Sequence, residues 1–174
     1  MEIRTGKLSV QKRSGGRFGG GRNHVRYDHK CRPTHIEVLC PNCRRLAIAT
    51  DSCAAEYSIF ATDSYPSWSK AEFDVKCTKC SYQRNHLTYF ELPKPFHEIY
   101  LYGERLWAWN LKHLEMIHRY LNRESVTGHP YEYFQTYIHG KWKKGRLKFV
   151  RAITQHLATH NLSFDTDAQA RRSI

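Results

Sequence analysis

Apolar and polar residues alternate along four short segments in the first half of the chain. The segments are HIEVLC (35–40), RRLAIA (44–49), AEFDVKC (71–77) and SYQRNHLTYFEL (81–92). An alternation with a period of two predicts β-strands with one buried face. A turn of a few residues joins the strands within each pair, whereas a longer stretch separates the pairs. We therefore expect two antiparallel strand pairs and an inserted loop at about residues 50–70.

The pattern changes in the segment EIYLYGERLWAWNLKHLEMIHRYLN, residues 98–122. Its first half predicts two strands around a turn at Gly103. The apolar residues of these strands are Ile99, Leu101, Leu106, Trp107 and Trp109. Asn110 is a favourable N-cap for a helix that follows them. The buried face of this helix would be formed by Leu111, Leu114, Ile117 and Leu121.

The last third of the chain predicts two more helices. After His129-Pro130, the segment YEYFQTYIHG is a candidate for a short helix that ends at Gly140. The next segment, KWKKGRLKFVRAITQHLATHN, has apolar residues at helical spacing in its second half. We expect these residues to form a buried stripe of Leu147, Val150, Ile153 and Leu157.

Two Cys-x-x-Cys turns connect the strands of the two pairs. The first contains Cys40 and Cys43, and the second contains Cys77 and Cys80. Each turn directs two thiolates to one side, so two facing turns provide four sulfur ligands in the tetrahedral arrangement that Zn²⁺ prefers. Strand, turn and strand, repeated, is the layout of a zinc ribbon. We therefore expect one structural Zn²⁺ as the cofactor.

The same cysteine spacing also occurs in redox motifs and disulfide frameworks. A thioredoxin-like motif opens directly into a helix, but residues 44–49 have a strand pattern. Disulfides form in oxidising compartments, and the polar segment after Met1 lacks the apolar core of a secretory signal. Cys31 and Cys53 could replace a ligand, but neither has a partner at this spacing. We expect Cys53 to be a small buried thiol and the two Cys-x-x-Cys pairs to bind the metal.

The excess positive charge is concentrated at the two ends of the chain. Residues 1–32 contain nine basic residues against two acidic ones, and residues 133–174 contain eight against two. The middle, residues 33–132, is almost neutral. Such a field attracts polyanions, of which nucleic acid is the most common. Basic ends also increase solubility without binding a partner, so both interpretations stay open.

Each basic end supplies candidate contacts to nucleic acid. Glycines and arginines alternate in KRSGGRFGGGRNHVR (12–26), a composition typical of flexible segments that bind phosphates. Near the other end, basic residues surround Trp142, whose indole would either contact a base or pack in the core. The candidate residues are Arg13, Arg17, Arg22, Arg26, Lys141, Trp142, Lys143, Lys144, Arg146 and Lys148.

One resemblance is carried by CPNC, by the distant second Cys-x-x-Cys and by LWAWNLKHLEMIHRYL. Together these motifs resemble a group of small bacterial zinc-ribbon proteins of poorly defined function. The resemblance covers roughly residues 36–158, and LWAWN-x-x-HL is its most specific part. It implies a zinc-ribbon fold and a bacterial, cytoplasmic setting.

These patterns together predict an α+β fold, in which an antiparallel zinc-ribbon sheet is packed by about three C-terminal helices. We expect a flexible basic arm (1–32), the ribbon domain with its inserted loop and packing helix (33–124), and a basic helical segment (125–174). No apolar run approaches the roughly 18 residues of a membrane span, so we expect no membrane partner.

The expected function is binding and not catalysis, because four thiolates leave no position on the metal for a reacting water. Two partners remain open. The protein would bind DNA or RNA through its basic arm and C-terminal segment, or it would dock onto a larger protein, which could itself process nucleic acid. Salt dependence distinguishes these functions, since phosphate contacts weaken steeply with ionic strength.

Overall fold

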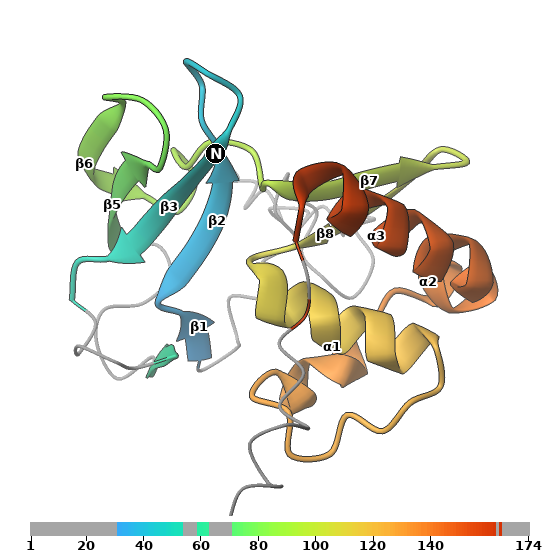
Figure 1. Ribbon diagram of the computed structural model, residues 1–174. Helices are drawn as coiled ribbons and strands as arrows, with labels where there is room; N and C mark the ends of the chain where they lie inside the picture. Colours follow the sequence, from blue (N-terminus) through green and yellow to red (C-terminus); the bar gives the residue numbers. More distant parts are fainter. Residues whose placement is uncertain (1–30, 54–58, 63–70, 163, 165–174) are drawn as a thin grey trace, which may run out of the picture.

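The computed structural model describes residues 31–53, 59–62, 71–162 and 164 of the 174-residue chain. The elements are β1 (Cys31–Pro33), β2 (His35–Leu39), β3 (Leu46–Asp51), β4 (Phe60–Thr62), β5 (Glu72–Cys77), β6 (Gln83–Thr88), β7 (His97–Leu101), β8 (Glu104–Ala108), α1 (Leu111–Leu121), the 3₁₀ helix η1 (Glu132–Tyr137), α2 (Gly140–Lys144) and α3 (Arg146–His160). A β-sheet lies on one side of the molecule and the helices lie on the other (Figure 1). The expected α+β fold is confirmed. None of the described helices combines the length and the apolar character that crossing a membrane requires.

The sheet contains four antiparallel strands in the order β2-β3-β5-β6. β2, β5 and β6 lie within three of the four alternating segments, and β3 begins in the segment 44–49 and continues two residues beyond it. Buried and more exposed residues alternate along β3 and β5, because successive side chains of a strand point to opposite faces. Ala47 of β3 pairs with Cys77 of β5. This register places the second cysteine turn beside the turn that joins β2 to β3.

The two outer strands of this sheet have different surroundings. Along β2, the N–H of Leu39 donates to the carbonyl of Lys94 over 2.8 Å, and the N–H of Phe96 donates to the carbonyl of Glu37 over 2.9 Å. Along β6, the register against β5 is interrupted by an irregularity. His86 of β6 also has a left-handed backbone, with φ of 56°. One edge of the sheet is therefore covered by another segment of the same chain, and the other edge is distorted.

The inserted loop contributes a strand of its own. β4 pairs antiparallel with β1, and Arg32 lies opposite Ala61. Cys31 and Arg32, which the charge pattern assigns to the basic arm, therefore belong to the first strand. The side chain of Arg32 is fully buried, and its Nε donates to Oδ2 of Asp51 over 2.7 Å. This buried ion pair connects β1 to the end of β3.

A hairpin and a capped helix follow the ribbon sheet. β7 and β8 pair from His97 and Ala108 to Leu101 and Glu104, around the expected turn. Asn110 caps α1 as predicted, because its side chain accepts a hydrogen bond from the N–H of His113 over 3.0 Å. The amide of Asn110 also donates to the carbonyl of His35 over 2.8 Å. The beginning of α1 is thus attached to the beginning of β2.

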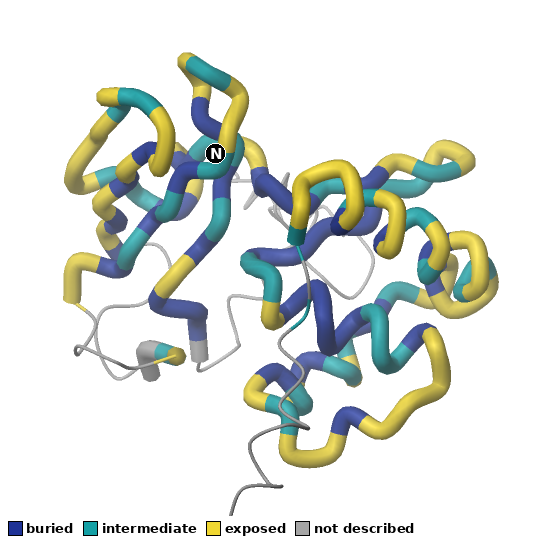
Figure 2. Tube along the Cα trace, viewed as in Figure 1, coloured by how far each residue is buried: buried dark blue, intermediate teal, exposed yellow. Residues whose placement is uncertain are grey.

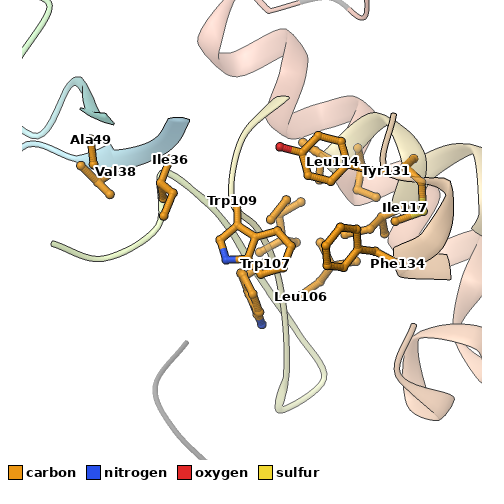
Figure 3. Packing of buried hydrophobic residues seen from close by; sticks show 14 of the residues in the cluster. Ile36, Val38, Ala49, Leu106, Trp107, Trp109, Leu114, Ile117, Tyr131 and Phe134 are labelled. Atoms are coloured by element: carbon orange, nitrogen blue, oxygen red, sulfur yellow. The ribbon is translucent and has the colours of Figure 1, made fainter. Parts of the chain in front are cut away.

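The hydrophobic core continues from the ribbon sheet into the helical side of the molecule (Figure 2). Its centre is a group of aromatic rings between the β7–β8 hairpin, α1 and η1 (Figure 3). The ring centroids of Trp107 and Trp109 are 5.5 Å apart, and those of Trp109 and Phe134 are 5.0 Å apart. Leu114 and Ile117 of α1 are buried beside them. Aromatic packing of this kind adds about 0.5–1.5 kcal/mol per pair to the burial of the rings.

The C-terminal segment differs from its sequence prediction in two respects. Gly140 begins α2 and does not end the preceding helix, which is a 3₁₀ helix. The buried stripe of α3 consists of Phe149, Ile153 and Leu157, whereas Leu147 is 54 % exposed. The prediction for Leu147 was wrong. Phe149 faces the core, and Leu147, two residues earlier, lies roughly 200° away around the helix and so faces solvent.

His113 gives the fold a specific dependence on pH. Its ring is stacked between those of Trp109 and Tyr131, with centroid distances of 4.6 and 5.2 Å. Burial, reinforced by electrostatic repulsion from the nearby His129 and His97, lowers the pKa of His113 to about 3. The unfolded chain takes up this proton below about pH 6.5, whereas the folded chain does not. Stability is therefore unaffected by this group above pH 6.5 and falls as the pH decreases towards 3.

We expect His113→Asn to reduce the pH dependence of the free energy of unfolding by about 1 kcal/mol between about pH 7.5 and 5.5. Asparagine retains an acceptor for the N–H of Trp109, which donates to His113 Nδ1 over 3.3 Å. Urea unfolding of the metal-loaded protein at both pH values measures the effect. Protonation of the cysteines affects parent and variant equally. The prediction would be contradicted if the free energy of unfolding changed between the two pH values by the same amount in the variant as in the parent.

Candidate metal centre and basic surface

The four predicted cysteines lie together in the structure. The sulfur atoms of Cys40, Cys43, Cys77 and Cys80 are all within 4.8 Å of one another. Sγ of Cys40 is 3.6 Å from Sγ of Cys80, and Sγ of Cys43 is 3.5 Å from Sγ of Cys77. A tetrahedral ion with bonds of about 2.3 Å requires separations of about 3.8 Å between its sulfur ligands. The four sulfurs can therefore bind one metal ion with only small shifts.

Backbone hydrogen bonds shape the two turns that carry the cysteines. The N–H of Cys40 donates to the carbonyl of Arg45 over 2.8 Å, and the N–H of Cys77 donates to the carbonyl of Tyr82 over 2.9 Å. The hydroxyl of Thr78 donates to the carbonyl of Leu46 over 2.8 Å. These bonds close each turn and attach the second turn to the beginning of β3.

The thiols cannot all ionise without a cation. Burial raises the pKa of Cys77, but the N–H groups of Lys79 and Cys80 donate to its sulfur over 3.3 and 3.4 Å, and with Cys43 they lower the pKa to about 6. The N–H of Tyr82 lowers the pKa of Cys80, but burial and the neighbouring thiols raise it to about 12. A divalent cation stabilises all four thiolates together. The donor set therefore fits a metal ion.

The environment of the site indicates what a bound ion can do. Cys40 and Cys77 are buried, and Cys43 and Cys80 are partly buried. Four protein ligands complete a tetrahedral shell, which is the arrangement of structural metal sites. Cys53 was expected to be buried but is exposed, in the turn that follows β3. The side chain of Cys31 lies outside the described part of the structure.

Most of the C-terminal basic candidates lie at the surface of α2 and the first turns of α3. Lys143, Lys144 and Lys148 are exposed. Lys141 is also exposed and forms an ion pair with Glu104 of β8. Arg146 is partly buried, and its guanidinium donates to the carbonyl of Leu121 over 3.4 Å at the end of α1. The N-terminal candidates Arg13, Arg17, Arg22 and Arg26 lie outside the described residues.

Trp142 belongs to the core and not to this basic surface. Only 8 % of the residue is exposed, and its Nε1 donates to the carbonyl of Arg105 over 3.1 Å. Its ring contacts that of Phe149, with 6.5 Å between the centroids. Of the two roles left open for Trp142, the structure shows packing, which fixes α2 against β8. Stacking on a base is therefore withdrawn.

A hydrogen-bonded cluster of polar side chains that the sequence did not predict connects the ribbon sheet to α3. Nε2 of His97 lies 2.5 Å from the carboxylate of Glu37 on β2, and Nδ1 of His97 lies 3.1 Å from Nε2 of His156 on α3. Glu37 also accepts a hydrogen bond from the N–H of Leu111 over 3.3 Å. His97 is fully buried. Glu37, His97 and His156 come from distant parts of the sequence, so no local sequence pattern could predict this cluster.

Two exposed tyrosines near the basic surface were also not predicted as candidate binding residues. Tyr100 and Tyr102 are 67 % and 77 % exposed at the end of the β7–β8 hairpin. Nζ of Lys148 lies 4.2 Å from the ring centroid of Tyr102. The sequence contained a signal for them, since Tyr100 occupies the polar position of an alternating strand and Tyr102 precedes the turn glycine.

Comparisons with known proteins add no relationship to these observations. No protein-family model, no curated protein and no solved structure matches the chain. The resemblance to small bacterial zinc ribbons therefore stays a prediction, and functional conclusions rest on the residues of this chain.

Proposed function

We propose that this chain is a non-enzymatic zinc-ribbon protein that binds nucleic acid through its basic arm and its C-terminal basic segment. Four thiolates favour Zn²⁺ among the common biological metals, and the complete shell supports a structural role. The metal would hold the two cysteine turns together and so maintain the ribbon sheet. Binding would then be performed by charged side chains outside the metal site.

The observation that carries the proposal is the separation of charged and apolar side chains in α2 and α3. Trp142 and Phe149 are buried, while Lys143, Lys144 and Arg151 are exposed. These three cations form no ion pair within the described part of the chain, and no acidic residue occurs from position 133 to 164. Their charge is therefore not neutralised locally. Such a surface retains counterions that phosphates can displace, which favours binding of nucleic acid.

Exchanging these three cations for alanine tests the proposal. We expect Lys143→Ala/Lys144→Ala/Arg151→Ala to weaken binding to both duplex and single-stranded probes. Each lost phosphate contact lowers the slope of log affinity against log salt by about 0.7–0.9, so the slope should fall by up to about 2–3. Arg146 is retained because it contacts the backbone of α1. Fluorescence anisotropy at several salt concentrations measures both quantities.

A charge-matched variant distinguishes a local surface from a general effect of net charge. Lys76→Ala/Arg84→Ala/Lys112→Ala removes the same charge from exposed positions on β5, β6 and α1. We expect this variant to change affinity only slightly. Equal binding by the parent and by the variant that lacks Lys143, Lys144 and Arg151 would overturn the proposal. Docking onto a larger protein would then be the better explanation of the exposed surface.

A further inference from the structure

The tip of the β7–β8 hairpin exposes an aromatic residue at a conformationally unfavourable position. The turn residues Tyr102 and Gly103 have φ of 50° and 74°. Two-residue hairpin turns with positive φ favour asparagine or glycine at the first position, because a larger side chain is strained there. Tyr102 gains little from packing in return, since 77 % of it is exposed. Strain retained at an exposed residue is a reason to look for a ligand.

Tyr100 is a second exposed aromatic residue of the same hairpin. It is 67 % exposed on β7, two positions before Tyr102. Its hydroxyl donates to Glu98 over 3.0 Å, and Arg105 donates to the same carboxylate oxygen over 2.8 Å. The hydroxyl end of the side chain is therefore held in place while the ring stays accessible. A fixed, accessible ring loses little conformational entropy when it binds a flat partner.

The hairpin tip is joined directly to the basic surface. Nζ of Lys148 on α3 lies 4.2 Å from the centroid of the Tyr102 ring. Lys141 of α2 pairs with Glu104, the first residue of β8. Trp142 is fixed to the carbonyl of Arg105 over 3.1 Å. These contacts connect α2 and α3 to the hairpin turn and to β8, so Tyr102 lies at the edge of the basic surface. Tyr100 precedes it by two positions on β7.

We infer that Tyr100 and Tyr102 form a stacking platform for unpaired bases, and that the nucleic acid bound by this protein is single-stranded. The inference rests on the proposed function and specifies its ligand. Lysines that contact phosphates attract both duplexes and single strands. Aromatic faces add affinity only where bases are unstacked and accessible, which is the binding mode of single-strand-binding proteins. A duplex keeps its bases within its own stack and cannot use the platform.

Removal of the two rings should affect single strands selectively. Probes are oligothymidylate and oligouridylate of about 20 nucleotides and a duplex of the same length. We expect Tyr100→Ala/Tyr102→Ala to weaken binding of both single strands at least about tenfold and to leave duplex binding and the salt slope nearly unchanged, because one stacked base contributes about 5- to 150-fold.

Variants at Tyr102 separate binding from folding. Tyr102→Asn introduces the residue that the turn prefers, so we expect an equal or higher melting temperature together with weaker single-strand binding. Tyr102→Phe keeps an aromatic face, and relative to the asparagine variant it should restore affinity. Tyr133→Ala removes a tyrosine of similar exposure, 62 %, from η1 and serves as the matched control.

The variants at Lys143, Lys144 and Arg151 distinguish failure of this inference from failure of the proposed function. If the tyrosine variants bind single strands as tightly as the parent while the lysine and arginine exchanges weaken binding, the platform is wrong and the proposed function stands. If those exchanges also have no effect, the proposed function is wrong, and the inference fails with it.

Discussion

Replacing Cys40 by serine is expected to abolish metal binding and cooperative folding together. The four sulfurs lie within 4.8 Å of one another, and a bound metal ion would link the two turns that carry them. Structural zinc contributes about 10–16 kcal/mol to the folding of zinc-finger peptides, which is comparable to the whole stability of a typical domain, about 5–15 kcal/mol. A chain that lacks one ligand would therefore lose most of the stability of its ribbon sheet.

Metal content by mass spectrometry and thermal unfolding by circular dichroism measure the two losses. The same serine exchange at Cys43, Cys77 or Cys80 should have the same effect. Cys53→Ser is the control, since Cys53 is exposed and outside the cluster, and it should retain one metal ion per chain and the melting temperature of the parent. A metal-free Cys40→Ser protein with a native unfolding transition would show that the site is dispensable for folding.

The second large effect is expected at the buried ion pair between Arg32 and Asp51. Both side chains are fully buried, and Nε of Arg32 lies 2.7 Å from Oδ2 of Asp51. Asp51→Asn removes the negative charge and leaves the guanidinium charge buried without it, which costs about 3–5 kcal/mol. For a chain of this size, the melting temperature should fall by about 6–20 °C. Thermal unfolding in the presence of metal tests this expectation.

Two further variants identify burial as the cause. Arg32→Met/Asp51→Leu replaces both charges with apolar groups and should recover much of the loss, because no buried charge is left without its partner. Glu72→Gln breaks the exposed ion pair between Glu72 and His86, whose side chains are 50 % and 73 % exposed, respectively. This loss should cost less than about 1 kcal/mol. Comparable losses from Asp51→Asn and Glu72→Gln would contradict the argument.

The cluster of four cysteines could be predicted from the sequence because the spacing within each pair is a local feature. Two cysteines three positions apart, each pair between strand segments, restrict where the sulfur atoms can point. The N-cap at Asn110 was equally predictable, since its partner, the N–H of His113, lies within the same turn.

Other features depend on contacts between distant segments. Trp142 lies in the core because a carbonyl of β8 accepts its N–H, and nothing near Trp142 in the sequence indicates that carbonyl. Gly145 separates α2 from α3. In α3 it is Phe149 that faces the core, although the apolar spacing had predicted a buried stripe that begins with Leu147. The pairing of β1 with β4 involves two strands of three residues, which are too short for an alternating pattern to identify.

The different surroundings of β2 and β6 affect how this protein can associate with others. An unpaired edge strand can add a strand from another molecule, which leads to aggregation or to peptide binding by strand addition. The segment around Lys94 and Phe96 already occupies the hydrogen-bonding groups beside β2. The register irregularity and the left-handed backbone of His86 interrupt the other edge. The two edges of the ribbon sheet are thus poorly suited to strand addition, so a partner that contacts this sheet would be recognised by its side chains.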